Sequence, residues 1–220
     1  MKREIVETKD GSHTIFIPEW NESYHSKNGA IQEAKHVFIQ AGLSLFKGKS
    51  ISVLEIGFGT GLNAFITFLE AKEVNQQINY VGVEAYPVVL EEVEKLNYVK
   101  ELKADKEKAV FQKMHTSNWE HETELSSFFK LNKRKQFFQD IKDVDSFDLV
   151  YFDAFGFNLQ PELWTEEIFK NLFVAMKKDA VLVTYACRTS IRKAMLSVGF
   201  RVEKLPGAPG KREMLRAFKQ

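Results

Sequence analysis

The sequence predicts an α/β fold, in which helices cover both faces of an open, doubly wound, mostly parallel sheet. Short apolar runs rich in β-branched residues alternate with segments of helical periodicity, a pattern typical of parallel strands joined by helices. The chain has 220 residues, 44% of them hydrophobic, which is enough for one sizeable core. The expected strands are ISVLEI, INYVGVEA, FDLVYFDAF and AVLVTYA.

The first 46 residues are expected to form a small N-terminal cap in front of the main domain, residues 47–220. Alternating segments flank Asp10-Gly11, which is a strong hairpin signal. From Gly29 to Phe46, apolar residues recur at three-to-four spacing and predict an amphipathic helix.

Four helices are expected to cover the sheet, at Leu62–Val74, Pro87–Leu96, Pro161–Met176 and Thr189–Val198. Near the end of the chain, FRVEKLP and REMLRAF flank a loop rich in proline and glycine, which predicts an antiparallel pair at the sheet edge. The basic run Lys133-Arg134-Lys135 is expected in a hairpin turn.

The composition narrows the class of protein. A single cysteine, Cys187, excludes an intrachain disulfide and a multi-cysteine zinc site. The five histidines show no metal-ligand spacing, so we expect catalysis without a metal. No apolar signal region and no run long enough to cross a bilayer occurs, so a soluble, cytoplasmic protein is expected.

The stretch LEIGFGTGLN places three glycines at alternate positions directly after the first parallel strand. Bare backbone at such a turn lets a ligand approach the N–H groups closely. A dinucleotide motif would need glycine at the position of Leu62, so the spacing here is G-x-G-x-G instead. Glu84 ends the next strand, where a carboxylate accepts hydrogen bonds from ribose hydroxyls.

Together, these features resemble the class I S-adenosylmethionine (SAM) methyltransferases, which have a Rossmann-like fold and an acidic residue before G-x-G-x-G. The resemblance implies SAM as cofactor. The residues that it assigns to cofactor binding are Glu55, Gly57, Phe58, Gly59, Gly61, Asn63 and Glu84. Glu33 and Asp140 are added by the narrower resemblance described next.

Several further motifs resemble the methyltransferase module of the bacterial tRNA-modification enzymes of the MnmC family, whose free-standing form is called MnmD. They are GFGTGLN, DLVYFDAF, PELW, TYAC and GKREML. The segment NGAIQEAKHVFIQAG resembles the family's entry segment, with Glu33 matching and Asn28 replacing an acidic residue. KQFFQD resembles a strand that closes in Gly-Asp, with Asp140 near the adenine and Gln139 in place of the glycine.

This resemblance implies a reaction: methylation of the primary amine of 5-aminomethyl-(2-thio)uridine at the tRNA wobble position, giving 5-methylaminomethyl-(2-thio)uridine. The family's flavin oxidase segment is not found after this module, so we expect no FAD. The free amine is then expected to come from a separate wobble-uridine modification pathway.

Asp153 stands at the carboxyl end of the strand FDLVYF and is the expected catalytic residue. Our hypothesis is that its carboxylate binds and aims the substrate amine first and accepts a proton second. A wall of aromatic side chains would lower the pKa of the amine by desolvation. The expected substrate-binding residues are Phe155, Phe157, Trp164, Lys211 and Arg212.

The last 33 residues are strongly basic, with nine Lys or Arg against two acids. Such segregation predicts a surface that contacts RNA phosphates, here the anticodon arm of tRNA, without reading its sequence. Two alternatives remain open. One is a SAM-dependent methyltransferase acting on another amine, of a small molecule or a protein; the other is a non-catalytic SAM-fold protein that binds RNA or a partner.

Overall fold

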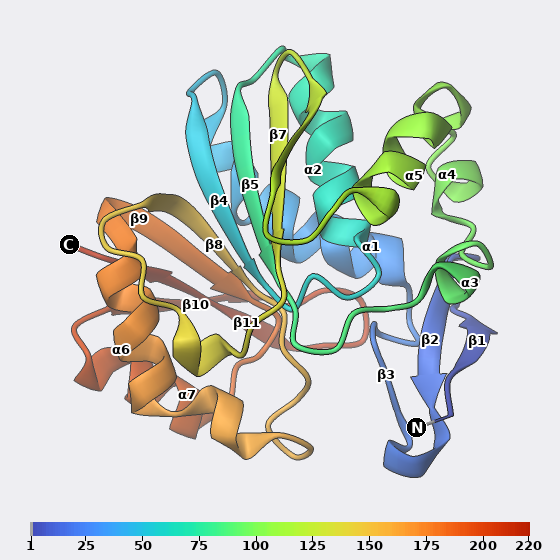
Figure 1. Cartoon of the computed structure of the whole chain (residues 1–220). Coiled ribbons are helices and arrows are strands. Elements are labelled where there is room, and N and C mark those ends of the chain that lie inside the picture. Colours follow the sequence, from blue (N-terminus) through green and yellow to red (C-terminus); the bar gives the residue numbers. More distant parts are fainter. Residues whose placement is uncertain (1) are drawn as a thin grey trace.

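A computed structural model describes residues 2–220. Eight strands form the main sheet, in the spatial order β10-β11-β9-β8-β4-β5-β7-β6 (Figure 1). Their bounds are β4 (Ile51–Ile56), β5 (Ile78–Val83), β6 (Glu122–Ser126), β7 (Phe129–Arg134), β8 (Phe147–Phe152), β9 (Met176–Thr184), β10 (Arg201–Pro206) and β11 (Glu213–Phe218). The five central strands β9, β8, β4, β5 and β7 pair in parallel, while β6 and β11 pair antiparallel with their neighbours. The expected mostly parallel sheet with an antiparallel C-terminal edge pair is confirmed.

The chain reverses its direction of travel across the sheet at β4. From β4 it moves to β5 and β7 on one side, then returns to β8 and β9 on the other. In an open α/β sheet, ligands bind beyond the carboxyl ends of the strands at such a reversal. A ligand site is therefore expected at the ends of β4 and β8, at Ile56 and Phe152.

Helices lie on both faces of the sheet, with α1, α2 and α5 on one side and α6 and α7 on the other (Figure 1). Their bounds are α1 (Ala30–Ala34), α2 (Leu62–Glu73), α3 (Leu90–Val93), α4 (Tyr98–Glu101), α5 (Lys108–Thr116), α6 (Glu166–Ala175) and α7 (Thr189–Ser197). A π-helix, Lys35–Gln40, continues α1, and short 3₁₀ turns occupy Pro18–Trp20, Leu43–Phe46, Asp105–Glu107, Phe138–Asp140 and Pro161–Trp164. Among residues 2–220, no helix is long and apolar enough to span a bilayer.

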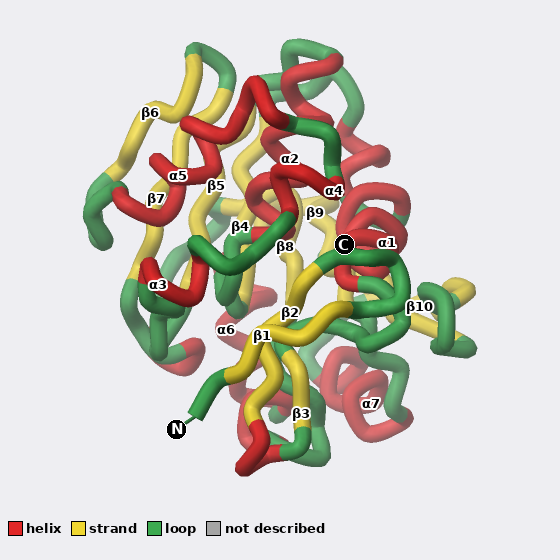
Figure 2. The backbone as a smooth tube through the Cα atoms, turned by 90° about the vertical axis from the view of Figure 1, so that its right-hand side faces the viewer, coloured by secondary structure: helices red, strands yellow, loops and turns green. Residues whose placement is uncertain are grey.

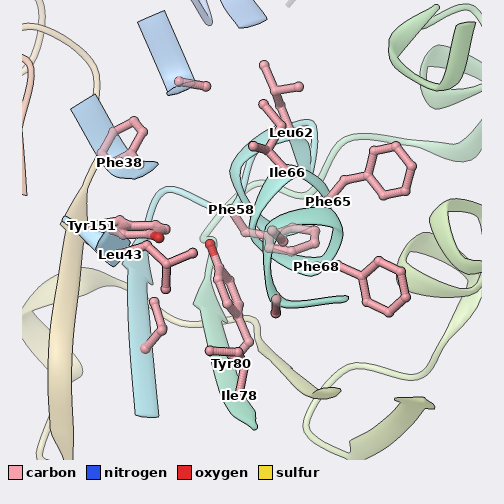
Figure 3. Packing of buried hydrophobic residues seen from close by; sticks show 14 of the residues in the cluster. Phe38, Leu43, Phe58, Leu62, Phe65, Ile66, Phe68, Ile78, Tyr80 and Tyr151 are labelled. Atoms are coloured by element: carbon pink, nitrogen blue, oxygen red, sulfur yellow. The ribbon is translucent and has the colours of Figure 1, made fainter. Parts of the chain in front are cut away.

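Alternate residues of the central strands enter two separate cores. Val53 and Tyr151 pack on the α2 side, whereas Leu54 and Val150 pack on the α6 side. Successive side chains of a strand point to opposite faces of the sheet, and here both faces are covered by apolar cores. The sequences of these strands are therefore almost continuously hydrophobic. Figure 3 shows the α2 side, where Tyr80 of β5 and Tyr151 of β8 lie on the face of the sheet and Phe65 and Phe68 extend from α2.

A separate three-stranded antiparallel sheet precedes the main one: β1 (Glu4–Glu7), β2 (His13–Ile17) and β3 (Glu22–Ser23). The expected hairpin around Asp10-Gly11 is confirmed by the pairing of β1 with β2. Figure 2 shows these strands grouped at one end of the large sheet. The following α1 packs into the same core as α2, and the division at residue 46 stays a prediction.

Several local expectations differ from the structure. KQFFQD forms no strand, because β7 ends at Arg134 and Phe138–Asp140 is a 3₁₀ turn. The helix expected over Pro87–Leu96 forms only at Leu90–Val93, because the chain then turns so that Asn97 accepts from the His13 N–H and donates to the Gly11 carbonyl. The expected hairpin turn at Lys133 is wrong, since Lys133 lies inside β7, paired with Gly82 of β5. Its buried amine donates to the His115 carbonyl at the end of α5.

Candidate active site

The glycine-rich loop joins β4 to α2 at the chain reversal. Gly57 has φ +89°, and a Cβ there would lie 2.7 Å from the Asp153 carbonyl oxygen. Gly59 has φ +48°, and a Cβ there would lie 3.2 Å from the Tyr24 ring. Glycine is thus required by conformation and by close approach, because β4, β8 and the N-terminal segment meet at this loop.

Glu84 follows β5 and holds the same loop in place. Its Oε2 accepts from the Gly59 N–H at 3.1 Å and its Oε1 from the Tyr86 N–H at 2.9 Å. Burial raises the pKa of this carboxyl, while these two backbone hydrogen bonds lower it. Each oxygen keeps a further lone pair for a ligand hydroxyl.

Asp153 directly follows β8. Its Oδ2 accepts from the Asn63 side-chain amide at 2.8 Å, and Asn63 comes from the first turn of α2. Burial, with the nearby Glu33 charge as the next cause, raises the pKa of Asp153 to about 7, against opposing effects of Asn63 and Lys211. The carboxyl is therefore poised to exchange a proton near neutral pH.

A cavity of about 570 Å³ opens at these strand ends. Its wall brings together five of the residues expected for the cofactor, the expected catalytic residue, and one expected for the substrate. These are Gly57, Phe58, Gly59, Asn63, Glu84, Asp153 and Phe155. The volume is in the range of cavities that hold small molecules and cofactors.

An aromatic corner lines part of this cavity. The Phe155 ring lies 5.4 Å from Trp20 and 5.1 Å from Tyr24, with interplanar angles of 86° and 78°. Burial raises the pKa of Tyr24 to about 12, so its phenol is neutral at physiological pH. The Phe155 ring therefore meets each of the other two rings edge to face, and it does not stack on either of them.

Sequence reasoning missed Trp20 and Tyr24, which reach the cavity from the N-terminal segment, as do Arg3 and His25. Arg3 bonds to Glu92 at 3.0 Å, and His25 contacts Thr60 of the glycine loop at 3.4 Å. Two large aromatics in an otherwise polar stretch were the only available signal, and local periodicity does not say where such a stretch docks.

Eight of the fifteen expected site residues do not line the cavity. Glu55 is fully buried beneath the loop. Asp140 is exposed in the turn Phe138–Asp140, whose Phe138 and Gln139 line the cavity instead. Trp164 is 2% exposed and donates from Nε1 to the Phe155 carbonyl at 2.8 Å, so it supports Phe155 from behind. Phe157 packs under Arg188, whose guanidinium carbon lies 4.6 Å from the ring centre.

Gly61, Glu33, Lys211 and Arg212 complete the expected set. Gly61 caps the N-terminus of α2 at φ +71° and does not line the cavity. Lys211 forms an ion pair with the buried Glu33, and its amine lies 3.8 Å from the Tyr185 ring centre. Arg212 is exposed on the turn between β10 and β11. Lys211 thus ties this turn to α1.

Most of the basic C-terminal residues have acidic partners. Ion pairs join Arg201 and Arg216 to Glu203, Lys204 to Glu213, Lys211 to Glu33 and Lys219 to Asp145. In residues 2–220, the four remaining cations of this segment have no ion-pair partner within 4.0 Å; they are Arg188, Arg192, Lys193 and Arg212.

Comparison with known proteins adds a family. Residues 97–220 match a family described as S-adenosyl-L-methionine-dependent methyltransferase. The chain is 28% identical over 220 residues to the tRNA 5-methylaminomethyl-2-thiouridine biosynthesis bifunctional protein MnmC of Leptospira interrogans, covering 92% of this chain and 33% of that protein. It is 29% identical over 214 residues to the protein of the same name from Campylobacter fetus, covering 92% and 34%.

A solved structure is similar over nearly the whole chain. The crystal structure of MNMC2 from Aquifex aeolicus superposes with a TM-score of 0.75 at 26% identity, covering 98% of this chain and 70% of that one. The chain spans about a third of the length of the two MnmC proteins.

Proposed function

The chain belongs to the S-adenosyl-L-methionine-dependent methyltransferases, and from this premise we propose that it methylates the primary amine of 5-aminomethyl-(2-thio)uridine at the tRNA wobble position. The product is 5-methylaminomethyl-(2-thio)uridine, and its 2-thiolated form gives both MnmC relatives their name. The observation that carries the proposal is the single cavity in which the glycine loop, Glu84, Asp153 and the aromatic corner meet.

The residues at the cavity suit SAM. Gly57 and Gly59 line the cavity with backbone alone, because a side chain at Gly57 would collide with Asp153 and one at Gly59 would crowd Tyr24. Glu84 offers a carboxylate to ribose hydroxyls at the end of β5, where this fold class binds nucleosides. Bound there, SAM supplies an electrophilic methyl group on a positively charged sulfur.

The charge balance of the cavity favours cations. Three acids line it, Glu84, Asp153 and Glu162, whereas its lining arginine, Arg3, already bonds to Glu92. Burial lowers the pKa of His25 to about 4, so this lining histidine is neutral. An alkylammonium substrate therefore enters a site of opposite charge.

Asp153 can handle the proton of that substrate. A free alkylamine, with a pKa like that of lysine at about 10.4, is mostly protonated at neutral pH and has no lone pair for attack. The aromatic corner of Trp20, Tyr24 and Phe155 excludes water and so favours the neutral amine. Ionised Asp153 first aims the ammonium and then accepts its proton, leaving the amine as the nucleophile.

The unpaired cations suggest how tRNA is held. Arg188 caps the start of α7, Arg192 and Lys193 lie in its middle, and Arg212 lies on the turn between β10 and β11. We propose that these four residues contact phosphates of the anticodon arm. Such contacts position the RNA without reading its sequence.

Purified protein should be incubated with labelled SAM and tRNA from cells blocked at the aminomethyl stage, and the digested nucleosides identified. Label in 5-methylaminomethyl-(2-thio)uridine supports the proposal. Label on a small amine or on protein, added as competitors, would move the substrate class elsewhere. Calorimetric SAM binding without transfer to any of them would favour a non-catalytic role.

A further inference from the structure

A short hydrogen-bonded chain runs from the interior of the sheet to the cavity. The Asn63 side-chain nitrogen donates to Glu55 Oε1 at 2.9 Å and to Asp153 Oδ2 at 2.8 Å. The three residues come from β4, α2 and the end of β8. One NH₂ group has two hydrogens, so this amide uses both to join the two carboxyl groups.

Glu55 itself does not reach the cavity. Its side chain is fully buried behind the glycine loop, while Asn63 and Asp153 line the cavity wall. The acidic residue that precedes the glycines, which we expected to bind the cofactor, is thus connected to the site through the Asn63 side chain.

We propose that Glu55 is a positioning residue for Asp153: as a neutral carboxylic acid it anchors the Asn63 amide, which in turn fixes Asp153 Oδ2 and leaves Oδ1 for the substrate. This inference rests on the proposed function for the task given to Asp153. In residues 2–220, Oδ1 has no hydrogen-bond partner, and Asp153 borders the cavity.

Unpartnered atoms around Glu55 support the neutral form. Within residues 2–220, Glu55 Oε2, Asn63 Oδ1 and the Tyr80 hydroxyl are buried without a hydrogen-bond partner. In this arrangement an ionised Glu55 would leave Oε2 as a buried charge without a hydrogen bond, which is costly; the nearby Tyr80 hydroxyl lowers the pKa of Glu55 but lies beyond hydrogen-bond distance. A proton on Oε2 supplies a donor to this group of atoms.

The surrounding charges act in the same direction. Burial raises the pKa of Glu55 well above its usual value, and the Asp153 and Glu84 charges add to this, while the Asn63 and Tyr80 side chains oppose it. Two carboxyl groups that share one amide favour a single negative charge. The charged or titratable groups that face Asp153 are Glu33, Glu55, Tyr80, Tyr185 and Lys211.

The test measures the midpoint of the Asp153 titration by ¹³C NMR of side-chain carboxyl groups. The Asp153 resonance is identified as the one that disappears in Asp153→Asn. The wild-type midpoint should lie near 7. Glu55→Gln keeps a neutral acceptor for Asn63 and should leave this midpoint within about 0.3 pH unit. Glu55→Leu and Asn63→Leu break the chain and should raise it by about one pH unit.

Tyr151→Phe is the matched control, because it removes an equally buried hydroxyl that is hydrogen-bonded to Thr67 and takes no part in the bonds between Glu55, Asn63 and Asp153. This variant should leave the midpoint in place. A midpoint that falls by about one unit in Glu55→Gln would show that Glu55 is ionised and overturn the proposal. An unmoved midpoint in Asn63→Leu would overturn it as well, even if Glu55→Leu fails to fold.

The titration needs neither SAM nor tRNA, so it separates this inference from the proposed function. If the variants show the predicted order of midpoints but the protein methylates no tRNA, the positioning role of Glu55 stands and the proposed function is wrong. In an active protein, Glu55→Leu and Asn63→Leu should also move the acidic limb of the pH–rate profile upward, and the double variant should shift it no further than either single one.

Discussion

At the residue scale, two carboxylates that follow β5 and β8, the strands on either side of β4, do different work because their surroundings differ. Glu84 accepts two backbone N–H bonds, whereas Asp153 accepts one side-chain amide and lies near the Glu33 charge. The first arrangement is suited to a fixed acceptor, and the second to a group that gains and loses a proton.

Replacing Asp153 by Asn should lower the rate of methyl transfer by at least about 100-fold, because the amide cannot accept the proton of the amine. The SAM dissociation constant, measured by calorimetry, should stay within about twofold if Asp153 serves the substrate rather than the cofactor. Asp148→Asn on the same strand, whose partners are Ser52 and Lys177, is the control. Wild-type rates in Asp153→Asn would refute the assigned role.

The raised pKa of Asp153 also predicts how stability depends on pH. The folded state holds this proton up to about pH 7, while an unfolded chain releases it near the ordinary value of 3.8. The contribution of Asp153 to stability is thus fully present below the ordinary pKa and is lost as pH rises through about 7. Denaturant titrations should find Asp153→Asn more stable than wild type at pH 8, by on the order of a few kcal/mol.

That advantage should shrink as the pH falls toward 5, where wild-type Asp153 is protonated in the fold. A stability difference that is the same at both pH values would contradict the raised pKa.

At the element scale, the small N-terminal sheet completes the cavity that the large sheet begins. The turn after β2 carries Trp20, and the segment after β3 carries Tyr24; both pack edge-on against Phe155. Their place depends on how two separate sheets dock, which no local pattern encodes.

Trp20→Ala should therefore admit water beside Asp153 and lower the turnover rate by about tenfold, with the tRNA dissociation constant little changed. Phe16→Ala, in β2 but absent from the cavity wall, is the control for damage to the small sheet. Equal losses in the two variants, or none in Trp20→Ala, would mean that the aromatic corner does not shield the reacting amine.

The strands and the site were not equally predictable from the sequence. β4 and β8 were predicted well because both of their faces are largely buried, so most of their residues are apolar. β7, with the sequence FKLNKR, reads as a surface turn, yet its Lys133 is buried against the His115 carbonyl. Trp164 and Phe155 are both aromatic and close in sequence, and only tertiary packing decides which of them faces the cavity.

At the scale of the whole molecule, the net charge of +1 hides a division between paired and unpaired cations. Replacing Arg188, Arg192 and Lys193 by Gln should weaken tRNA binding and reduce the slope of log K against log salt by about two. Neutralising the paired residues Arg201, Lys204 and Lys219 should change that slope by less. Equal changes in both sets, measured by fluorescence titration, would indicate only a diffuse charge effect.

The central claim is that the protein methylates, in this cavity, the primary amine of 5-aminomethyl-(2-thio)uridine at the tRNA wobble position. The most direct test uses two anticodon stem-loop RNAs that differ only at the wobble position, one with 5-aminomethyluridine and one with uridine, and counts methyl groups by mass spectrometry. We predict one methyl per aminomethyl RNA, located on the amine, and none on the uridine RNA. Methylation of both RNAs, or of neither despite measured SAM binding, would contradict the account.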